Sequence, residues 1–192
     1  NAYNIINRVF LGRLPDARDA LAAAGIGGAA LMIQFAPVIG LSAGAAALIS
    51  QFLGAERYDD ADEATRQSLL LSVLAGGISG IPLIIWALPI VRLIGAEGSV
   101  PPLAASYTAI IAFFSIPLFV YMIITTALRS AGDVMSALYA GAVVIFFNIV
   151  LDWLLIFGPG PFPAMGIRGA AWATGISRIV GVAVTVWFLK RS

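Results

Sequence analysis

Two pairs of polar side chains interrupt the last two apolar runs of this sequence. Asn148 and Asp152 are four residues apart, and so are Thr174 and Arg178. Residues at i and i+4 are neighbours on one face of an α-helix, so each pair would point to one side. A charged side chain inside a membrane costs about 2.5–3.5 kcal/mol on insertion scales, and such residues mark a function or a buried pair. We therefore expect these four residues to carry the chemistry of the chain.

Carboxamide side chains nearer the N-terminus add further oxygen ligands. Asn4 and Asn7 would share one face of a short first helix, and Gln34 stands alone in the next apolar run. Carboxamide, carboxylate and hydroxyl oxygens suit a hard cation such as Na⁺, and a buried carboxylate can instead hold a proton. A structural alternative makes Asp152 and Arg178 a buried ion pair. The spacing favours neither interpretation, and the two are compatible.

The composition excludes several other chemistries. The chain has no cysteine and no histidine, which rules out thiolate nucleophiles, imidazole metal sites and a Ser-His-Asp triad. Eleven basic and ten acidic residues give a net charge of +1, without the basic excess expected of a nucleic-acid-binding protein. We expect no enzyme activity, no nucleic-acid partner and no metal beyond Na⁺ at the polar residues.

Long apolar segments define the elements that must position these residues. Only 11% of the 192 residues are charged, against about 25% in a soluble domain. About 20 apolar residues at 1.5 Å each cross a membrane. Five such runs cover 21–53, 67–94, 103–128, 134–157 and 169–189, and a shorter one covers 1–14. The sequence predicts an all-α membrane protein with six transmembrane helices, the first truncated, and hence a piece of a longer protein.

Small residues and prolines recur within these segments. The pairs Gly40–Gly44 and Gly76–Gly80 are spaced for close approach of helix backbones in lipid. Proline lacks the backbone N–H and clashes with the preceding turn, so we expect helices to kink or break at the prolines inside apolar runs. These prolines are Pro37, Pro82, Pro89 and Pro117.

Several motifs, taken in chain order, resemble those of the multidrug and toxic compound extrusion (MATE) transporters. Residues 3–12 are similar to the Y-N-x-x-D-R-x-F-x-G stretch of the family's first helix, and residues 128–133 to its L-R-x-x-G-D turn. Residues 148–158 match the N-x-x-L-D…I-F-G pattern of its fifth helix, and residues 165–174 resemble the entry to its sixth. Each motif is weak alone, but together they cover nearly the whole chain.

The resemblance implies that residues 1–192 form the N-terminal six-helix lobe of a twelve-helix antiporter. Such transporters export drugs and other small, often cationic, organic molecules from the cytoplasm across the inner membrane in exchange for Na⁺ or H⁺. They use no cofactor besides that coupling ion. The partners implied are the lipid bilayer and a C-terminal lobe, or a second copy of this chain. Carried over, the cation-binding residues are Asn7, Asn148, Asp152 and Thr174, with Arg178 as a charge partner.

One departure from the family pattern affects coupling. The motif has aspartate where this chain has Asn7, so Asp152 alone would carry the titration. Two transport alternatives are a related flippase of lipid-linked oligosaccharides and a polysaccharide exporter. From other classes, an intramembrane aspartyl protease is disfavoured because Ser130-Ala131-Gly132-Asp133 lacks its G-x-G-D motif. A purely structural bundle is disfavoured by the two charges within spans.

Overall fold

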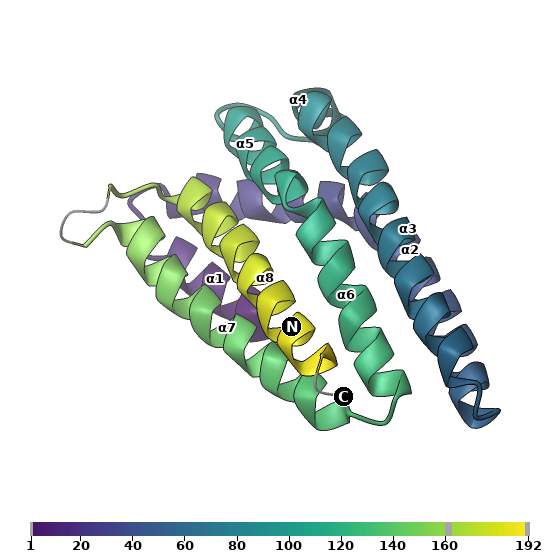
Figure 1. Ribbon diagram of the computed structural model, residues 1–192. Helices are drawn as coiled ribbons and strands as arrows, with labels where there is room; N and C mark the ends of the chain where they lie inside the picture. The colour runs from purple at the N-terminus through teal and green to yellow at the C-terminus, as the bar shows by residue number, and fades with distance from the viewer. Residues whose placement is uncertain (1, 160–162, 191–192) are drawn as a thin grey trace.

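The computed structural model describes residues 2–159 and 163–190, with side chains described from residue 7 onward. Helices, and no strands, make up the regular structure of these residues (Figure 1). They are α1 (Ala2–Leu11), α2 (Ala17–Gly54), α3 (Tyr58–Ile85), α4 (Ala87–Leu93), α5 (Val100–Phe113), α6 (Ser115–Ser130), α7 (Val134–Phe157) and α8 (Ile167–Leu189). The all-α class predicted from the sequence is confirmed.

Four of these helices are long and apolar enough to cross a membrane: α2, α3, α7 and α8. A fifth crossing arises if α5 and α6, which meet at an angle of 50°, are taken as one broken span. Large apolar side chains such as Leu70, Ile78 and Phe146 are exposed along them, as expected of surfaces that face lipid. Helix α1, with 10 residues, is too short to cross a membrane alone.

Two predicted helices are each divided in two. The run 67–94 covers most of α3 and all of α4, separated at Trp86. The run 103–128 covers most of α5 and of α6, separated at Phe114. Each break lies three residues before a proline. The carbonyl groups that Pro89 and Pro117 leave without an N–H donor belong to the last residues of α3 and α5. In contrast, α2 and α3 continue as helices through Pro37 and Pro82.

The bend between α5 and α6 is held by small residues and one buried polar contact. A Cβ atom at Gly76 of α3 would lie 2.9 Å from the Ile116 Cα, and one at Gly80 would lie 2.9 Å from the Ala112 carbonyl oxygen. The side chain of Gln34, buried in α2, donates a hydrogen bond to the Ser115 hydroxyl at 2.5 Å. Helices α2 and α3 therefore pack directly against the break.

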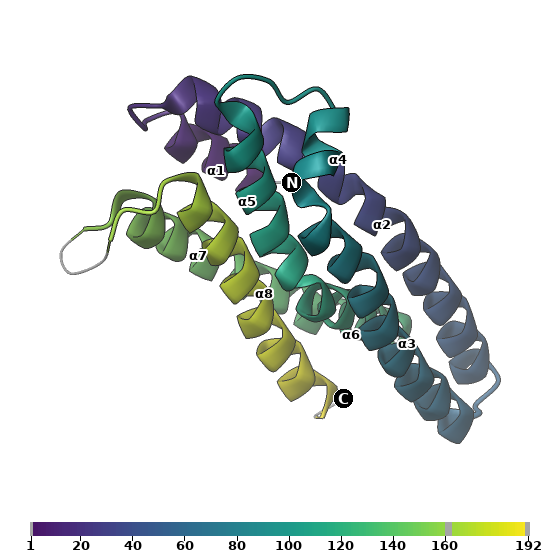
Figure 2. The same ribbon diagram turned by 90° about the horizontal axis from the view of Figure 1, so that it is seen from above.

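Helices α7 and α8 are antiparallel neighbours and pack closely, with α6 beside α8 (Figures 1 and 2). A Cβ atom at Gly169 would overlap the backbone carbonyl of Leu155. That carbonyl also accepts a hydrogen bond from the Met165 N–H at 2.9 Å, which ties the start of α8 to the end of α7. This packing fixes the register in which α7 and α8 face each other.

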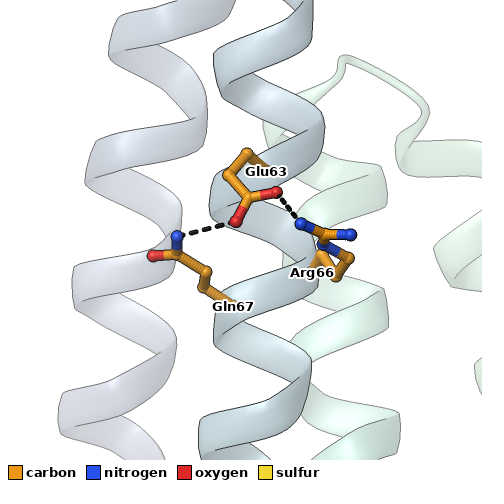
Figure 3. Close-up of polar contacts among 3 residues, drawn as sticks. All are labelled: Glu63, Arg66 and Gln67. Carbon is orange, nitrogen blue, oxygen red and sulfur yellow. Dashed lines mark hydrogen bonds and ion pairs between the residues drawn. The ribbon is translucent and has the colours of Figure 1, made fainter.

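Charged residues gather at the start of α3, which is helical from Tyr58. The Glu63 carboxylate accepts hydrogen bonds from Gln67, at 2.8 Å, and from Arg66 (Figure 3). One turn before it, Arg57 and Asp60 form an exposed ion pair at 2.7 Å. These contacts keep the charges at one end of the helix.

Helix α7, which carries two of the candidate residues, begins with a side-chain cap. The Asp133 carboxylate accepts a hydrogen bond from the Ser136 N–H at 3.0 Å. Hydrogen bonding to the side chain of Ser136, and secondly to its backbone, lowers the pKa of Asp133 below its ordinary value of 3.8. Because its folded-state pKa is lowered, the carboxylate stabilises the fold above about pH 4 and loses this effect as the pH falls through the lowered value.

We expect Asp133→Ala to lower the melting temperature of the detergent-solubilised protein by a few degrees at pH 7, because an N–H of the first turn loses its acceptor. Asp133→Asn keeps an acceptor and should lose less. The differences between wild type and both variants should shrink in melting curves recorded below pH 4. A difference independent of pH would show that the carboxylate charge does not contribute to the cap.

A candidate cation site between helices α7 and α8

The polar pair of α7 lies on the buried side of its helix. Asn148 is 2% exposed and Asp152 is 0% exposed, whereas the adjacent Trp153 is 52% exposed. Asp152 therefore faces the interior of the helix bundle and not the lipid. A carboxylate at such a depth needs nearby polar groups, a bound cation or a proton to offset its lost hydration.

Thr174 of α8 meets Asn148 across the helix pair. The Asn148 Nδ2 group donates to the Thr174 hydroxyl at 3.5 Å, and that hydroxyl donates to the Ala170 carbonyl oxygen at 2.9 Å. The Thr174 oxygen keeps a second lone pair in this arrangement. The Oδ1 atom of Asn148 is buried without a hydrogen-bond donor among the described residues. Two neutral oxygens capable of accepting a cation or a proton donor are thus present one helical turn from Asp152.

A cavity of about 280 Å³ opens beside this contact, between α2, α6, α7 and α8. Its apolar walls come from five side chains: Phe35, Leu118, Met122, Val144 and Ile145. Its polar lining comes from five more: Tyr121, Asn148, Thr174, Ser177 and Arg178. The structure therefore brings three of the five predicted residues to one cavity, and adds Tyr121 and Ser177.

Arg178 and Asp152 lie on opposite sides of the Asn148–Thr174 contact. Helices α7 and α8 are antiparallel (Figure 1). By residue number, Asp152 is therefore one turn nearer their 158–166 connection than Asn148, and Arg178 is one turn farther from it than Thr174. Four residues on each helix at 1.5 Å per residue separate the two along the axes by about 12 Å. A direct ion pair would require the Arg178 side chain to extend over most of that distance, so the ion-pair interpretation stays a hypothesis.

Asn7 belongs to the first helix, α1. It is 6% exposed on α1, which packs against α7. It contributes to a separate hollow of about 220 Å³ that also includes Leu11, Gly28 and Tyr107. Asn7 is therefore buried, as a cation ligand must be, but it does not line the cavity that Asn148 and Thr174 share. The side chain of Asn4 lies outside the described residues.

Sequence patterns could have indicated one of the additional cavity residues. Ser177 follows Thr174 by three residues, so it shares a helix face with it, and its hydroxyl donates to the Thr174 carbonyl oxygen at 2.9 Å. Tyr121 has no such signal, because it comes from an apolar run that carries no other cavity polar group. Only the packing of α6 beside α8 brings it to the cavity.

Comparisons with known proteins agree with this arrangement of helices. The family model described as MatE matches residues 1–154. The probable multidrug resistance protein YoeA of Bacillus subtilis is 34% identical over 162 residues, covering 84% of this chain and 34% of the relative. The FAD transporter of Shewanella oneidensis is 30% identical over 189 residues, covering 97% of this chain and 41% of the relative.

A solved structure has the same fold. The crystal structure of a MATE protein in the bent conformation superposes with a TM-score of 0.89 at 28% identity, covering 99% of this chain and 42% of that structure. The chain thus spans between about a third and two fifths of the length of these relatives.

Proposed function

This chain belongs to the MatE family, and we propose from this premise that it is the N-terminal lobe of an antiporter that exports small organic molecules in exchange for Na⁺ or H⁺. The chain is a multi-pass membrane protein, and we place it in the cytoplasmic membrane. Relatives named as a probable multidrug resistance protein and as an FAD transporter support an exporter of drugs or other small compounds.

The observation that carries the coupling proposal is a fully buried acid beside neutral oxygen ligands. Asp152 is 0% exposed, and one turn away the buried Oδ1 of Asn148 has no hydrogen-bond donor among the described residues. A carboxylate in such surroundings is stabilised by a bound proton or cation, because either one offsets the free-energy cost of its lost hydration. We assign Asp152, Asn148 and Thr174 to the coupling-ion site. Asn7, on the helix α1 that packs against α7, is assigned as a further neutral ligand.

The proposed transporter needs a second lobe. Transporters built from repeated halves bind substrate between the halves and alternate access by rocking one against the other. The partner is either a C-terminal lobe of the same protein or a second copy of this chain. No cofactor takes part beyond the coupling ion.

The alternative functions remain a flippase of lipid-linked oligosaccharides or a polysaccharide exporter. Such relatives line their cavities with more basic residues. Here Arg178 is the only basic residue among the described side chains that line the cavity beside Asn148. The relatives named for multidrug resistance and FAD transport therefore make the small-molecule exporter the better-supported proposal.

The test is transport by the full-length protein in sealed vesicles. Ethidium and FAD serve as substrate probes, and Na⁺ and pH gradients are imposed separately. We expect movement of at least one probe to be several-fold faster with one of the two gradients than without either. A rate of probe transport that is the same with and without each gradient would contradict antiport. Gradient-driven transport of a lipid-linked oligosaccharide would support the flippase alternative.

A further inference from the structure

We propose that Arg178 binds an anionic group of the transported molecule, so that this transporter favours aromatic compounds carrying a phosphate or carboxylate over simple organic cations. This inference rests on the proposed export function and names its substrate class. The site is the cavity of about 280 Å³ between α2, α6, α7 and α8.

The charge of the cavity lining points to an anion. Arg178 is the one charged side chain among the described residues that line it, and no carboxylate joins it there. An organic cation in this cavity would meet a guanidinium and no acidic partner. Asp152 lies on the other side of the Asn148–Thr174 contact, about 12 Å farther along the helix axes.

The position of Arg178 makes a purely structural role costly. It is the twelfth of the 23 residues of α8, near the middle of the span, where an arginine is costly to insert and marks a function or a buried pair. A guanidinium has five N–H donors in a planar fork, which fits phosphate and carboxylate oxygens. An interaction with one neighbouring group therefore leaves donors for a ligand.

The other walls of the cavity suit a flat aromatic body. Phe35 and Tyr121 supply rings, and Met122 supplies a flexible, polarisable side chain that adapts to different shapes. Cavities that hold a whole drug-sized ligand are about 300–1,000 Å³. At about 280 Å³, this one has room for the acidic group and one ring system of a larger molecule.

Riboflavin and FMN provide a matched test, because they share one ring system and differ by a single phosphate. We expect the full-length wild type in dodecyl maltoside to bind FMN at least tenfold more tightly than riboflavin, measured by flavin fluorescence. Arg178→Met should reduce FMN affinity at least tenfold and leave riboflavin affinity within about twofold. A hydrogen bond to a charged group is worth about 1.5–3 kcal/mol, which corresponds to this fold-change. Arg178→Lys keeps the charge and should retain part of the preference.

Each other outcome overturns the inference. Arg178 does not bind the phosphate group if the wild type binds FMN no more tightly than riboflavin. The same conclusion follows if Arg178→Met leaves FMN affinity unchanged. Equal loss of both flavins in Arg178→Met would mean that the cavity itself has collapsed and that Arg178 is structural. Displacement of FMN by phosphatidylglycerol would assign Arg178 to a lipid headgroup. Gradient-driven transport can be absent while FMN affinity still depends on Arg178, and FMN affinity can be independent of Arg178 while transport still depends on a gradient. The two proposals are therefore tested separately.

Discussion

Asp152→Asn should leave the full-length protein folded and abolish the dependence of its transport on Na⁺ and pH gradients. Asparagine has nearly the same shape as aspartate, so the packing of α7 against α8 is kept. It neither takes up a proton near neutral pH nor offers a negative charge to Na⁺. The ratio of efflux with a gradient to efflux without one should fall to about one, measured in vesicles with the probe that the wild type transports.

A matched control is available on the same helix. Asp133→Asn makes the same chemical change at the α7 cap, outside the buried cluster, and should leave the gradient dependence intact. Asn7→Asp should add a second acid and strengthen cation binding or shift its pH dependence. If Asp152→Asn keeps the wild-type gradient dependence, Asp152 is structural, and an ion pair with Arg178 becomes the better explanation of both charges.

The sequence was most informative where one short-range rule decides the structure. The predicted ranges of α7 and of most of α8 agree with the observed helices, because each is a single apolar run bounded by glycines and polar turns. The i, i+4 spacing placed Asn148 and Asp152 on one face, and both are buried. That Asn148 meets Thr174 also depends on the antiparallel packing of two consecutive helices.

Other features depend on contacts between distant segments and have no local signal. Gly40–Gly44 and Gly76–Gly80 have the same spacing, but a Cβ at either member of the first pair meets no neighbouring atom within 4 Å, whereas the second pair packs against the α5–α6 bend. Likewise, no local pattern indicates that Asn7 lines a different hollow from the one that Asn148 and Thr174 line. Which face of a helix meets which neighbour follows from the tertiary packing.

Gly169→Ala should destabilise the lobe more than the same methyl addition at Gly141 of α7. The new Cβ would overlap the Leu155 carbonyl and lie 2.9 Å from the Ile156 nitrogen, and backbone atoms cannot rotate away as a side chain can. The start of α8 would have to move off α7 and weaken the Met165–Leu155 hydrogen bond. Overpacking of this kind costs about 1–3 kcal/mol, or more where backbone must shift.

Gly141→Ala is the internal control, since it adds the same methyl group to α7 itself. Its Cβ would have only the Tyr121 hydroxyl nearby, at 3.8 Å, which is an ordinary contact. Alanine is also the better helix former by about 1 kcal/mol, so this variant should be neutral or slightly more stable.

We expect Gly169→Ala to lower the melting temperature in detergent by roughly 5–10 °C relative to Gly141→Ala. Because Gly169 precedes Ala170, whose carbonyl holds the Thr174 hydroxyl, the displaced helix should also weaken gradient-driven efflux. Equal melting temperatures for the two variants would show that α8 can shift along α7 without cost, and the register assigned to the cation site would then be wrong.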